Sequence, residues 1–495
     1  MHVLTRQLII TICTAGLLLG SLFATAGRGT PAVAATPSGV AYAWGNNDGG
    51  QLGNGTMKTT NNPTPEPAAL PSGVTVTAVA AGKVHSLAIG SDGKVYSWGY
   101  NGFGQLGDGT TFDSSTPLAI TLASGVTATA IAAGSYHSLA IGSNGTVYTW
   151  GSNSSGQLGN GTTNESDSPA AITLASGVTA TAIAGGGAYS LAIGSNGKVY
   201  AWGFNSDGQL GNGTTTSSST PVAITLASGV TATAIAAGAY HSLAIGSDGK
   251  VYSWGYNGGG ELGNGTTTSS STPMAITLAS GVTPRTIAAG TSHSLAIGSN
   301  GTVYAWGFNN NGQLGNGTTT MSLTPVAITL ASGVTATAVA AGYAHSLGIG
   351  SNGRIYAWGS NSAGQLGNGM SNTSPNPTPA MVNLPSGKIA LALGTGSQAD
   401  HSLAILTSAP TAAILSRFRV IHAGNALLFH WRVASGAGIR GFFLTAGTHR
   451  LNRWLIQSHA QHSRYAYVSR WQGHGPYLLH GVLPGGAVVT LASTG

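Results

Sequence analysis

Histidine is the side chain in this sequence whose type and spacing could most readily do chemistry. A His-Ser-Leu tripeptide recurs along the chain, and Tyr189 takes the histidine's place in one further copy. The six histidines are His85, His137, His241, His293, His345 and His401. Imidazole can bind zinc or carry protons, but one histidine per repeat predicts a ring whose members are too far apart to share one ion at bonds of about 2 Å. We therefore expect the histidines to be structural, with ring nitrogens that satisfy backbone groups between repeats.

Carboxylates, the other usual catalytic groups, are scarce and scattered. The chain has 495 residues, of which only 6% are charged, and 11 are Asp or Glu. Glu165 and Asp167 are close in sequence, but they fall in a polar stretch without a histidine. The segment 102–107 matches G-x-G-x-x-G without the βαβ context that nucleotide binding needs. No Walker, H-E-x-x-H or EF-hand motif is present. The sequence predicts a protein that is not an enzyme and has no cofactor or metal.

Aromatic side chains form a third set, at positions that vary from repeat to repeat. They follow a Trp-Gly pair or precede the recurring histidine, and they are Tyr100, Phe103, Tyr136, Phe204, Tyr240, Tyr256, Phe308 and Tyr343. Tyrosine and phenylalanine bury much area for few torsions, so they are favoured at binding surfaces. The alternative is that they pack between repeats, as aromatic residues do in any core. We predict that these eight residues form a binding surface.

A repeat of about 50 residues must position all of these side chains. Trp-Gly occurs seven times, at Trp44, Trp98, Trp150, Trp202, Trp254, Trp306 and Trp358. One unit contains TAIAAG, HSLAIG and VYTWG, with an Asn-Gly turn before the third segment. These segments alternate as strands do, and Asn-Gly or Asp-Gly is typical of a hairpin turn. Pro117 and its equivalents are expected just before a fourth strand. Four antiparallel strands per unit predict a propeller blade.

The two ends of the repeat region complement each other. Trp44 has no His-Ser-Leu segment before it, and His401 has no Trp-Gly after it. Residues 388–406 are therefore expected to supply the inner strands, and residues 39–70 the outer strands, of one composite blade. This pairing removes open sheet edges. The fold class predicted is all-β: a seven-bladed β-propeller of four-stranded antiparallel blades closed by N- and C-terminal strands, followed by a small β-sandwich.

The segment AAGKVHSLAIGSDGKVYSWGYNGFGQLGDG, at residues 80–109, resembles the regulator of chromosome condensation repeat family. The resemblance covers about 370 residues and seven copies. It implies a seven-bladed propeller. Within the family, the chain resembles secreted bacterial propellers that inhibit β-lactamase through one face of the disc. The founding eukaryotic member implies a second possibility, nucleotide exchange on a small GTPase.

Strand order decides which loops share a face. The loops that carry the eight aromatic residues are expected at one end of the disc, and the Asn-Gly hairpins at the other. Positions that are identical in every blade are expected to be structural, whereas positions that differ are free for recognition. The hairpin end is rich in Gly, Ser, Asn and Asp, so we expect it to be inert.

Charge divides the chain near residue 408. Residues 39–407 hold 8 Lys or Arg and 11 Asp or Glu, whereas residues 408–495 hold eight Arg and no acid. We expect residues 36–407 to be the propeller and residues 408–495 a basic β-sandwich that resembles fibronectin type III or immunoglobulin-like modules. A polyanionic envelope polymer is its expected partner. The arginines proposed for this contact are Arg417, Arg419, Arg432, Arg440, Arg450 and Arg453. The alternative is a merely solubilising surface.

The N-terminus has the pattern of a secretory signal peptide. Arg6 precedes an apolar run, Leu8 to Ala24, and A-x-A sites follow at residues 24–26 and 32–34. We assign residues 1–35 to this segment, with a short membrane anchor as the alternative. The mature chain is then expected to be secreted or held at the cell surface.

Three functions compete at this point. The first is a secreted binding protein that recognises a protein or glycan through the aromatic face. The second is the nucleotide-exchange regulator that the family resemblance implies, which a signal peptide and a mildly acidic propeller disfavour. The third is an enzyme that uses the central channel, whose expected lining of Ala, Gly, Thr and Ile offers few titratable groups. We predict the first, with no nucleic-acid partner.

Overall fold

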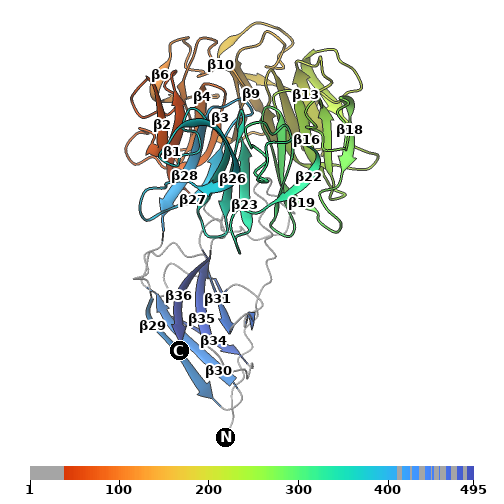
Figure 1. Cartoon of the computed structure of the whole chain (residues 1–495). Coiled ribbons are helices and arrows are strands. Elements are labelled where there is room, and N and C mark those ends of the chain that lie inside the picture. The colour runs from red at the N-terminus through yellow and green to blue at the C-terminus, as the bar shows by residue number, and fades with distance from the viewer. Residues whose placement is uncertain are drawn as a thin grey trace.

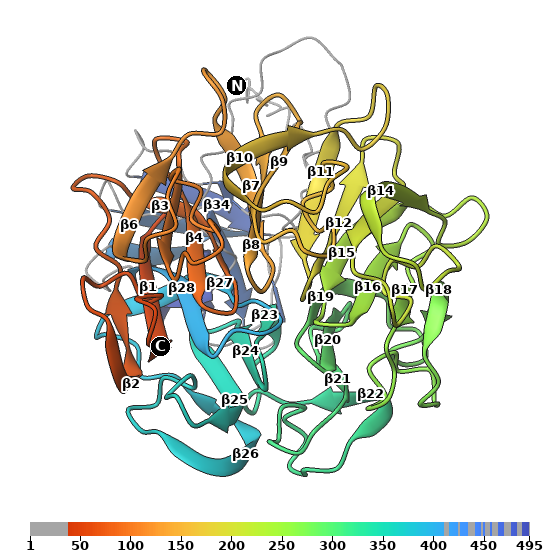
Figure 2. The same cartoon turned by 90° about the horizontal axis from the view of Figure 1, so that it is seen from above.

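The computed structural model describes residues 38–409 and, beyond them, the backbone of the strands between residues 415 and 494. The described residues form strands and turns and contain no helix, so none that could span a membrane. Seven four-stranded antiparallel sheets surround a central axis (Figures 1 and 2). Each innermost strand contacts the innermost strands of both neighbouring sheets, so the ring is closed. The predicted seven-bladed propeller is confirmed.

The four strands of each blade run outward from the axis. The first strands are β3 (Val76–Ala81), β7 (Ala128–Ala133), β11 (Ala180–Gly185), β15 (Ala232–Ala237), β19 (Pro284–Ala289), β23 (Ala336–Ala341) and β27 (Lys388–Gly394). The second are β4 (His85–Gly90), β8 (His137–Gly142), β12 (Tyr189–Gly194), β16 (His241–Gly246), β20 (His293–Gly298), β24 (His345–Gly350) and β28 (His401–Ser408). The third are β1 (Val40–Asn47), β5 (Val95–Gly99), β9 (Val147–Gly151), β13 (Val199–Gly203), β17 (Val251–Gly255), β21 (Val303–Gly307) and β25 (Ile355–Asn361). The fourth are β2 (Lys58–Pro67), β6 (Ser114–Ile120), β10 (Ser166–Ile172), β14 (Ser218–Ile224), β18 (Ser270–Ile276), β22 (Ser322–Ile328) and β26 (Asn372–Met381).

The composite blade joins the two ends of the propeller. Its strands lie in the order β2-β1-β28-β27, and β1 pairs with β28 from Val40↔Leu406 to Gly45↔His401. The pairing predicted between residues 388–406 and 39–70 is therefore present. Because this blade contains strands from both ends of the repeat region, the ring cannot open without breaking that ladder.

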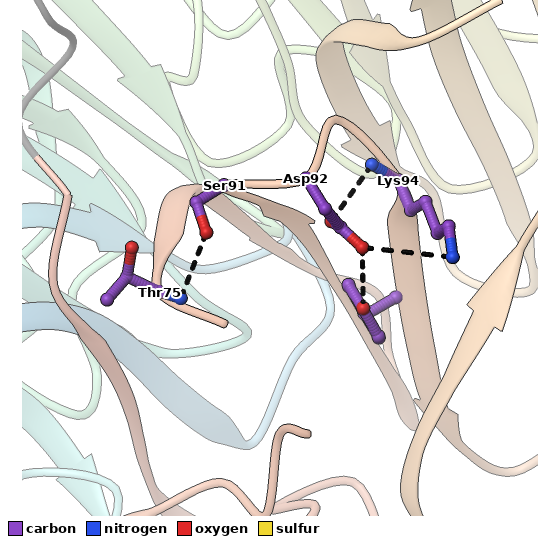
Figure 3. A network of polar contacts seen from close by, with 5 residues as sticks. Thr75, Ser91, Asp92 and Lys94 are labelled. Atoms are coloured by element: carbon purple, nitrogen blue, oxygen red, sulfur yellow. Dashed lines mark hydrogen bonds and ion pairs between the residues drawn. The ribbon is translucent and has the colours of Figure 1, made fainter. Parts of the chain in front are cut away.

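The hairpin between the second and third strands is a tight turn that its own side chains brace. In the first complete blade Gly93 has φ of +76°, which favours glycine. Figure 3 shows Ser91, Asp92 and Lys94 at this turn. Asp92 accepts hydrogen bonds from the Lys94 backbone N–H at 3.2 Å and from the Tyr96 hydroxyl at 2.9 Å. The hairpin turn predicted from Asp-Gly and Asn-Gly is therefore present.

The prolines expected before the fourth strands lie within them instead. Pro117 belongs to β6, and the ladder to β5 shifts register between the pairs Ser97↔Leu118 and Gly99↔Ser114. The residues skipped by that shift do not pair, so a residue without an N–H fits there at the outer edge of the blade. The fourth strand therefore begins before the proline, because the register shift lets the proline lie inside the strand.

A repeated joint of buried polar groups connects each blade to the next. At the joint between the composite blade and its neighbour, His401 Nε2 lies 2.9 Å from Ser86 Oγ. The Ser86 hydroxyl donates to the Gln51 carbonyl at 2.7 Å, and Trp98 Nε1 donates to that same carbonyl at 2.8 Å. His401 and Gln51 belong to one blade, and Ser86 and Trp98 to the next. All four side chains are buried.

The other joints repeat this arrangement. The remaining five His–Ser contacts are also 2.9 Å, and they are His85–Ser138, His137–Ser190, His241–Ser294, His293–Ser346 and His345–Ser402. In the seventh joint the Tyr189 hydroxyl takes the imidazole's place, since it donates to the His241 carbonyl at 2.5 Å and lies 3.0 Å from Ser242 Oγ. The structural role predicted for the histidines holds, but their partner is a serine hydroxyl rather than the backbone.

The joint fixes the protonation of each imidazole. Because the serine proton points at a carbonyl, the serine oxygen must accept from Nε2–H. Nδ1 then carries no proton, and in all six histidines it is buried without a hydrogen-bond partner. Burial lowers the pKa of His293 and four other histidines to about 3, and that of His137 to about 4, from 6.5.

Two further antiparallel sheets follow the propeller. One has the order β29-β30-β34 and the other β32-β31-β35-β36, with β33 beside β31. Their strands are β29 (Leu415–Ala423), β30 (Ala426–Val433), β31 (Gly441–Ala446), β32 (His449–Arg450), β33 (Ile456–Gln457), β34 (Arg464–Ser469), β35 (Tyr477–Val482) and β36 (Val488–Thr494). Two sheets are what the predicted β-sandwich requires. The predicted signal peptide, residues 1–35, lies outside the described residues.

We predict steep unfolding of the propeller in mild acid. Below pH 6.5 the six imidazoles of the unfolded chain bind protons, whereas those of the folded chain stay neutral. The free energy of unfolding is therefore highest above pH 6.5 and falls as the pH drops. Six sites together remove on the order of 8 kcal/mol by about pH 5.5. The measurement is the free energy of unfolding by urea between about pH 8 and pH 5.

Tyr189 provides the matched variants for this test. His293→Tyr copies the tyrosine joint, so unfolding in acid should take up one proton fewer and the free energy of unfolding should depend less steeply on pH. Tyr189→His should add one proton and make the dependence steeper. Equal slopes for wild type and both variants would show that the imidazoles do not set the acid sensitivity.

Candidate functional site

The eight predicted aromatic residues all belong to loops at one end of the disc, which we call the aromatic face. This end holds the loops from first to second strand and from third to fourth strand of every blade. None of the eight is buried. Tyr343, Tyr240 and Tyr256 are the most exposed, at 50%, 41% and 38% of their surface, and the other five are partly exposed. The face therefore presents aromatic surface to solvent.

Three of these residues form a cluster across one joint. Tyr100 and Phe103 belong to the loop after β5, and Tyr136 to the loop before β8 of the next blade. Their ring centroids lie 5.1 to 6.4 Å apart in tilted or edge-on arrangements. Lys83 Nζ lies 5.5 Å from the centre of the Tyr136 ring. Both earlier interpretations apply here, because the rings pack against each other between blades and still reach the surface.

A second pair lies on the blade β15–β18. Tyr240 and Tyr256 make an edge-on contact with centroids 6.5 Å apart. The Tyr256 hydroxyl lies directly over Gly258, where any side chain would collide with it. Tyr100 lies over Gly102 in the same way. Glycine two residues after the tyrosine thus lets each ring lie on its own loop. Two residues after Phe204 and Phe308 the sequence has Ser206 and Asn310 instead of glycine.

Charge separates sharply between the two ends of the disc. The loops of the aromatic face and the fourth-strand starts next to them carry eight carboxylates against Lys58 and Lys83. The carboxylates are Asp48, Asp108, Asp113, Glu165, Asp167, Asp207, Glu261 and Asp400. The opposite end, the hairpin face, carries six cations against Asp92 and Asp248. The cations are Lys94, Lys198, Lys250, Arg285, Arg354 and Lys388.

This separation corrects the composition expected for the hairpin face, which is basic as well as rich in small polar residues. Its Lys and Arg follow the turns or begin inner strands, and five of the six are exposed. The net charge of the propeller in sequence, eight cations against 11 acids, conceals two faces of opposite sign. The signal was present in the sequence as a lysine or arginine after the Asn-Gly or Asp-Gly pair, but only strand direction assigns it to one face.

Glu261 is the most unusual group on the aromatic face. Six blades place glutamine in the Gly-x-Leu-Gly loop, and this blade places a glutamate that is only 1% exposed. Glu261 Oε2 accepts the Gly259 N–H at 2.8 Å. A Cβ on Gly259 would lie 2.7 Å from Glu261 Oε1 and 3.2 Å from Phe308 Cβ, so both atoms border the space above Gly259. Burial raises the pKa of Glu261 to about 7.

The glutamines explain what is missing around Glu261. Where the residue after Trp-Gly is polar, the glutamine amide donates to it, as Gln157 does to Ser152 and Gln365 to Ser360, both at 3.4 Å. Where that residue is aromatic, as with Gln105 and Gln209, the amide has no partner. Glu261 faces the aromatic Tyr256 in the same way, and no ion pair to it exists within residues 38–409. Its acceptor capacity is therefore partly unused.

The central channel ends under a longer loop of the composite blade. The first strands line a cavity of about 240 Å³ with Ala, Val, Ile, Leu and Gly residues, and Thr395 and Ser397 of the loop after β27 complete the lining. Ser135 Oγ donates to Gln398 Oε1 at 2.6 Å, and Thr291 Oγ1 donates to the Ser397 carbonyl at 2.5 Å. The loop thus reaches blades on both sides of the channel. The strands thus give the channel an apolar wall, and its hydroxyl groups come from this loop.

Asp400 completes this loop on the aromatic face. Its Oδ1 lies 3.5 Å from Gln365 Nε2. Burial raises the pKa of Asp400 to about 6, and the nearby Lys83 opposes that shift. No group of three His, Cys, Asp or Glu that could hold a metal ion occurs in the part of the chain that the structure describes.

Comparison with known families finds related profiles along the propeller. The RCC1-like domain matches residues 25–233. The regulator of chromosome condensation (RCC1) repeat matches residues 248–297, 300–349 and 352–405. A second model of the RCC1 repeat matches residues 232–261, 285–313 and 336–365, so the matches together cover residues 25–405 without a gap.

Individual proteins show the same relationship. The ultraviolet-B receptor UVR8 of Arabidopsis thaliana is 32% identical over 340 residues, which are 68% of this chain and 77% of the receptor. The E3 ubiquitin-protein ligase HERC2 of Homo sapiens is 32% identical over 76% of this chain, but this chain spans only 8% of the ligase. The solved structure of Prp20p from Saccharomyces cerevisiae has a TM-score of 0.67 at 25% identity and covers 76% of this chain and 92% of its own.

We predict that Glu261→Gln stabilises the propeller in alkaline solution. The raised pKa means that the folded acid keeps its proton where the unfolded acid has lost it, so the cost of Glu261 grows as the pH rises from 4.5 and is complete above pH 7. The variant should gain about 3 kcal/mol at pH 8 and about 2 kcal/mol at pH 6. Urea unfolding at both pH values measures the gain. The matched variant Gln209→Glu should lose stability with the same pH dependence. A gain that does not change with pH would show that the charge of Glu261 costs nothing.

Proposed function

Because the chain belongs to the regulator of chromosome condensation repeat family, we propose that it is a non-enzymatic binding protein that recognises a protein or glycan through its aromatic face. The observation that carries this proposal is the exposure of Tyr240, Tyr256 and Tyr343 on loops whose residues differ from blade to blade. Positions shared by all blades are used by the joints. The variable positions are left for recognition.

The path of the chain supports the same face. β1 begins and β28 ends at the hairpin face, and the Ala409 N–H there donates to the Gly387 carbonyl at 2.6 Å. The connections to both outer segments therefore leave from the end opposite the aromatic face. A ligand can approach the aromatic loops without displacing these connections.

Compartment and the C-terminal module are further parts of the proposal. The apolar run Leu8 to Ala24 with its A-x-A sites supports secretion or attachment at the cell surface. Arg417, Arg432 and Arg464 hold directly opposed positions on β29, β30 and β34. Eight arginines without an acid beyond residue 408 support a polyanion such as an envelope polymer as the partner of this module. Arg419 and Arg450 also lie on strands, whereas Arg440 and Arg453 fall outside the described residues.

One specific observation keeps the regulatory alternative open. The structure similar to this propeller, Prp20p, was reported with its binding properties to Gsp1p and histones. Carried over to this chain, that likeness would make a GTPase or a chromatin protein the partner. The apolar run Leu8 to Ala24 favours another compartment.

We predict that the aromatic face retains a partner from the producing organism. The full chain is immobilised and exposed to envelope and secreted proteins and to isolated glycan polymers, beside the variant Phe204→Ala/Tyr256→Ala/Phe308→Ala. Loss of several exposed aromatic contacts should reduce retention at least tenfold, since anchoring aromatic residues contribute about 2 kcal/mol each. The control is Met381→Ala, which removes an exposed apolar side chain at the end of β26, on the hairpin face. Equal retention by all three proteins would move recognition away from the aromatic face.

A further inference from the structure

Two independent features of the aromatic face indicate the chemistry of its ligand. The first is its field, which comes from eight carboxylates and two lysines at one end of a disc whose other end is positive. Such a surface attracts and orients a cationic partner before contact and repels an anionic one. The positive hairpin face and the eight arginines beyond residue 408 reinforce this orientation, because they repel that same partner.

The second feature is the buried carboxylate in the loop that carries Tyr256. Glu261 replaces the glutamine of the other six blades, and the Gly259 N–H donates to its side chain. Its Oε1 and the first carbon of the Phe308 side chain both border the space above Gly259. A carboxylate in a low-dielectric site interacts with an incoming charge far more strongly than one in water. The six equivalent loops carry a neutral glutamine and form the same joint through its backbone carbonyl, so the joint does not need this charge.

Aromatic rings complete the surroundings of this carboxylate. Tyr256 is 38% exposed and Tyr240 41% exposed, and Phe308 is partly exposed on the neighbouring blade. Ring faces attract guanidinium and ammonium groups. The protein already uses this contact elsewhere on the same face, where Lys83 Nζ lies 5.5 Å from the Tyr136 ring centre.

We propose that the Glu261 site, formed by Tyr240, Tyr256, Glu261 and Phe308, binds an arginine or lysine side chain of a cationic polypeptide segment. This proposal rests on the proposed function, since it names the ligand class of the aromatic face. The cation stacks on the exposed rings, and the Glu261 carboxylate balances its charge. The remaining acids of the face contact neighbouring basic residues of that segment.

The cost of Glu261 to the fold supports a role in binding. A buried acid with a raised pKa destabilises the folded state when it ionises. Groups that lower stability without a structural reason concentrate at functional sites. A bound cation removes the penalty, because it supplies the charge that the blade itself lacks.

The test uses unlabelled nona-arginine as the probe and the full chain as the protein. Isothermal titration calorimetry at low ionic strength and about pH 8 keeps Glu261 ionised. We expect nona-arginine to bind, and Glu261→Gln to weaken it about tenfold, the loss of one charge-assisted contact. Tyr256→Ala should weaken binding several-fold. Glu165→Gln removes the same charge from an exposed position elsewhere on the face and should change affinity less than about twofold. Nona-glutamate should not bind.

Several results would overturn the proposal. Equal weakening by Glu261→Gln and Glu165→Gln would show that only the overall charge matters, and no binding would remove the cationic ligand altogether. Sedimentation of the full chain without peptide gives a third result. Self-association that Glu261→Gln abolishes would identify the arginine-rich segment of a second copy as the occupant, rather than a partner protein.

The outcome for the proposed function can be separated from these results. If Phe204→Ala/Tyr256→Ala/Phe308→Ala loses the natural partner while Glu261→Gln retains it fully, the aromatic face stands as a binding surface and the cationic ligand class falls. If the natural partner requires both, the two proposals stand together.

Discussion

The joint between blades, a buried imidazole–hydroxyl–carbonyl contact, is the interaction on which the rest of this structure depends. Each blade alone would leave a polar histidine and a tryptophan N–H without partners. The neighbouring blade supplies the serine hydroxyl, and one glutamine carbonyl accepts both the hydroxyl and the indole N–H. Buried polar groups are costly unless they are paired, so a blade is complete only beside its neighbours. Seven such joints in a closed ring define the disc and hold every loop of the aromatic face at a fixed angle.

The joints also divide the positions of each repeat between structure and recognition. The contact uses the side chains of histidine, serine and tryptophan and the backbone carbonyl of glutamine. These residue types vary little from blade to blade. Two departures are informative because they differ in kind. Tyr189 replaces a histidine and restores the contact with its own hydroxyl, so it conserves structure. Glu261 keeps the backbone role, with its carbonyl accepting from Ser294 and Trp306, but changes the side chain from neutral to acidic. That change adds nothing to the joint.

Electrostatics give the disc a direction. The acidic aromatic face and the basic hairpin face lie on opposite sides of the same blades, and the arginine-rich module is attached on the basic side. If the proposed polyanionic partner binds the basic side, the aromatic face is left free for its own ligand. The low proportion of charged residues makes the arrangement effective, because few neighbouring charges of opposite sign cancel the field of each face. The uncharged apolar core of the blades separates the two faces.

The sequence by itself determined the blade, the number of blades, the closure of the ring and the faces to which the aromatic loops belong. These follow from periodicity, hairpin turns and complementary ends, which are local or repeated signals that strand alternation translates directly into structure. Only the tertiary structure decided the hydrogen-bond partner of the histidines, the burial of Glu261 and the pairing of Tyr240 with Tyr256. The reason is physical, because each of these depends on side chains from different loops or neighbouring blades. The sequence of one repeat does not determine how its side chains pack against the next blade. The split of charge between faces was written in the sequence, but it became visible only when strand direction assigned each lysine and aspartate to one end of the disc.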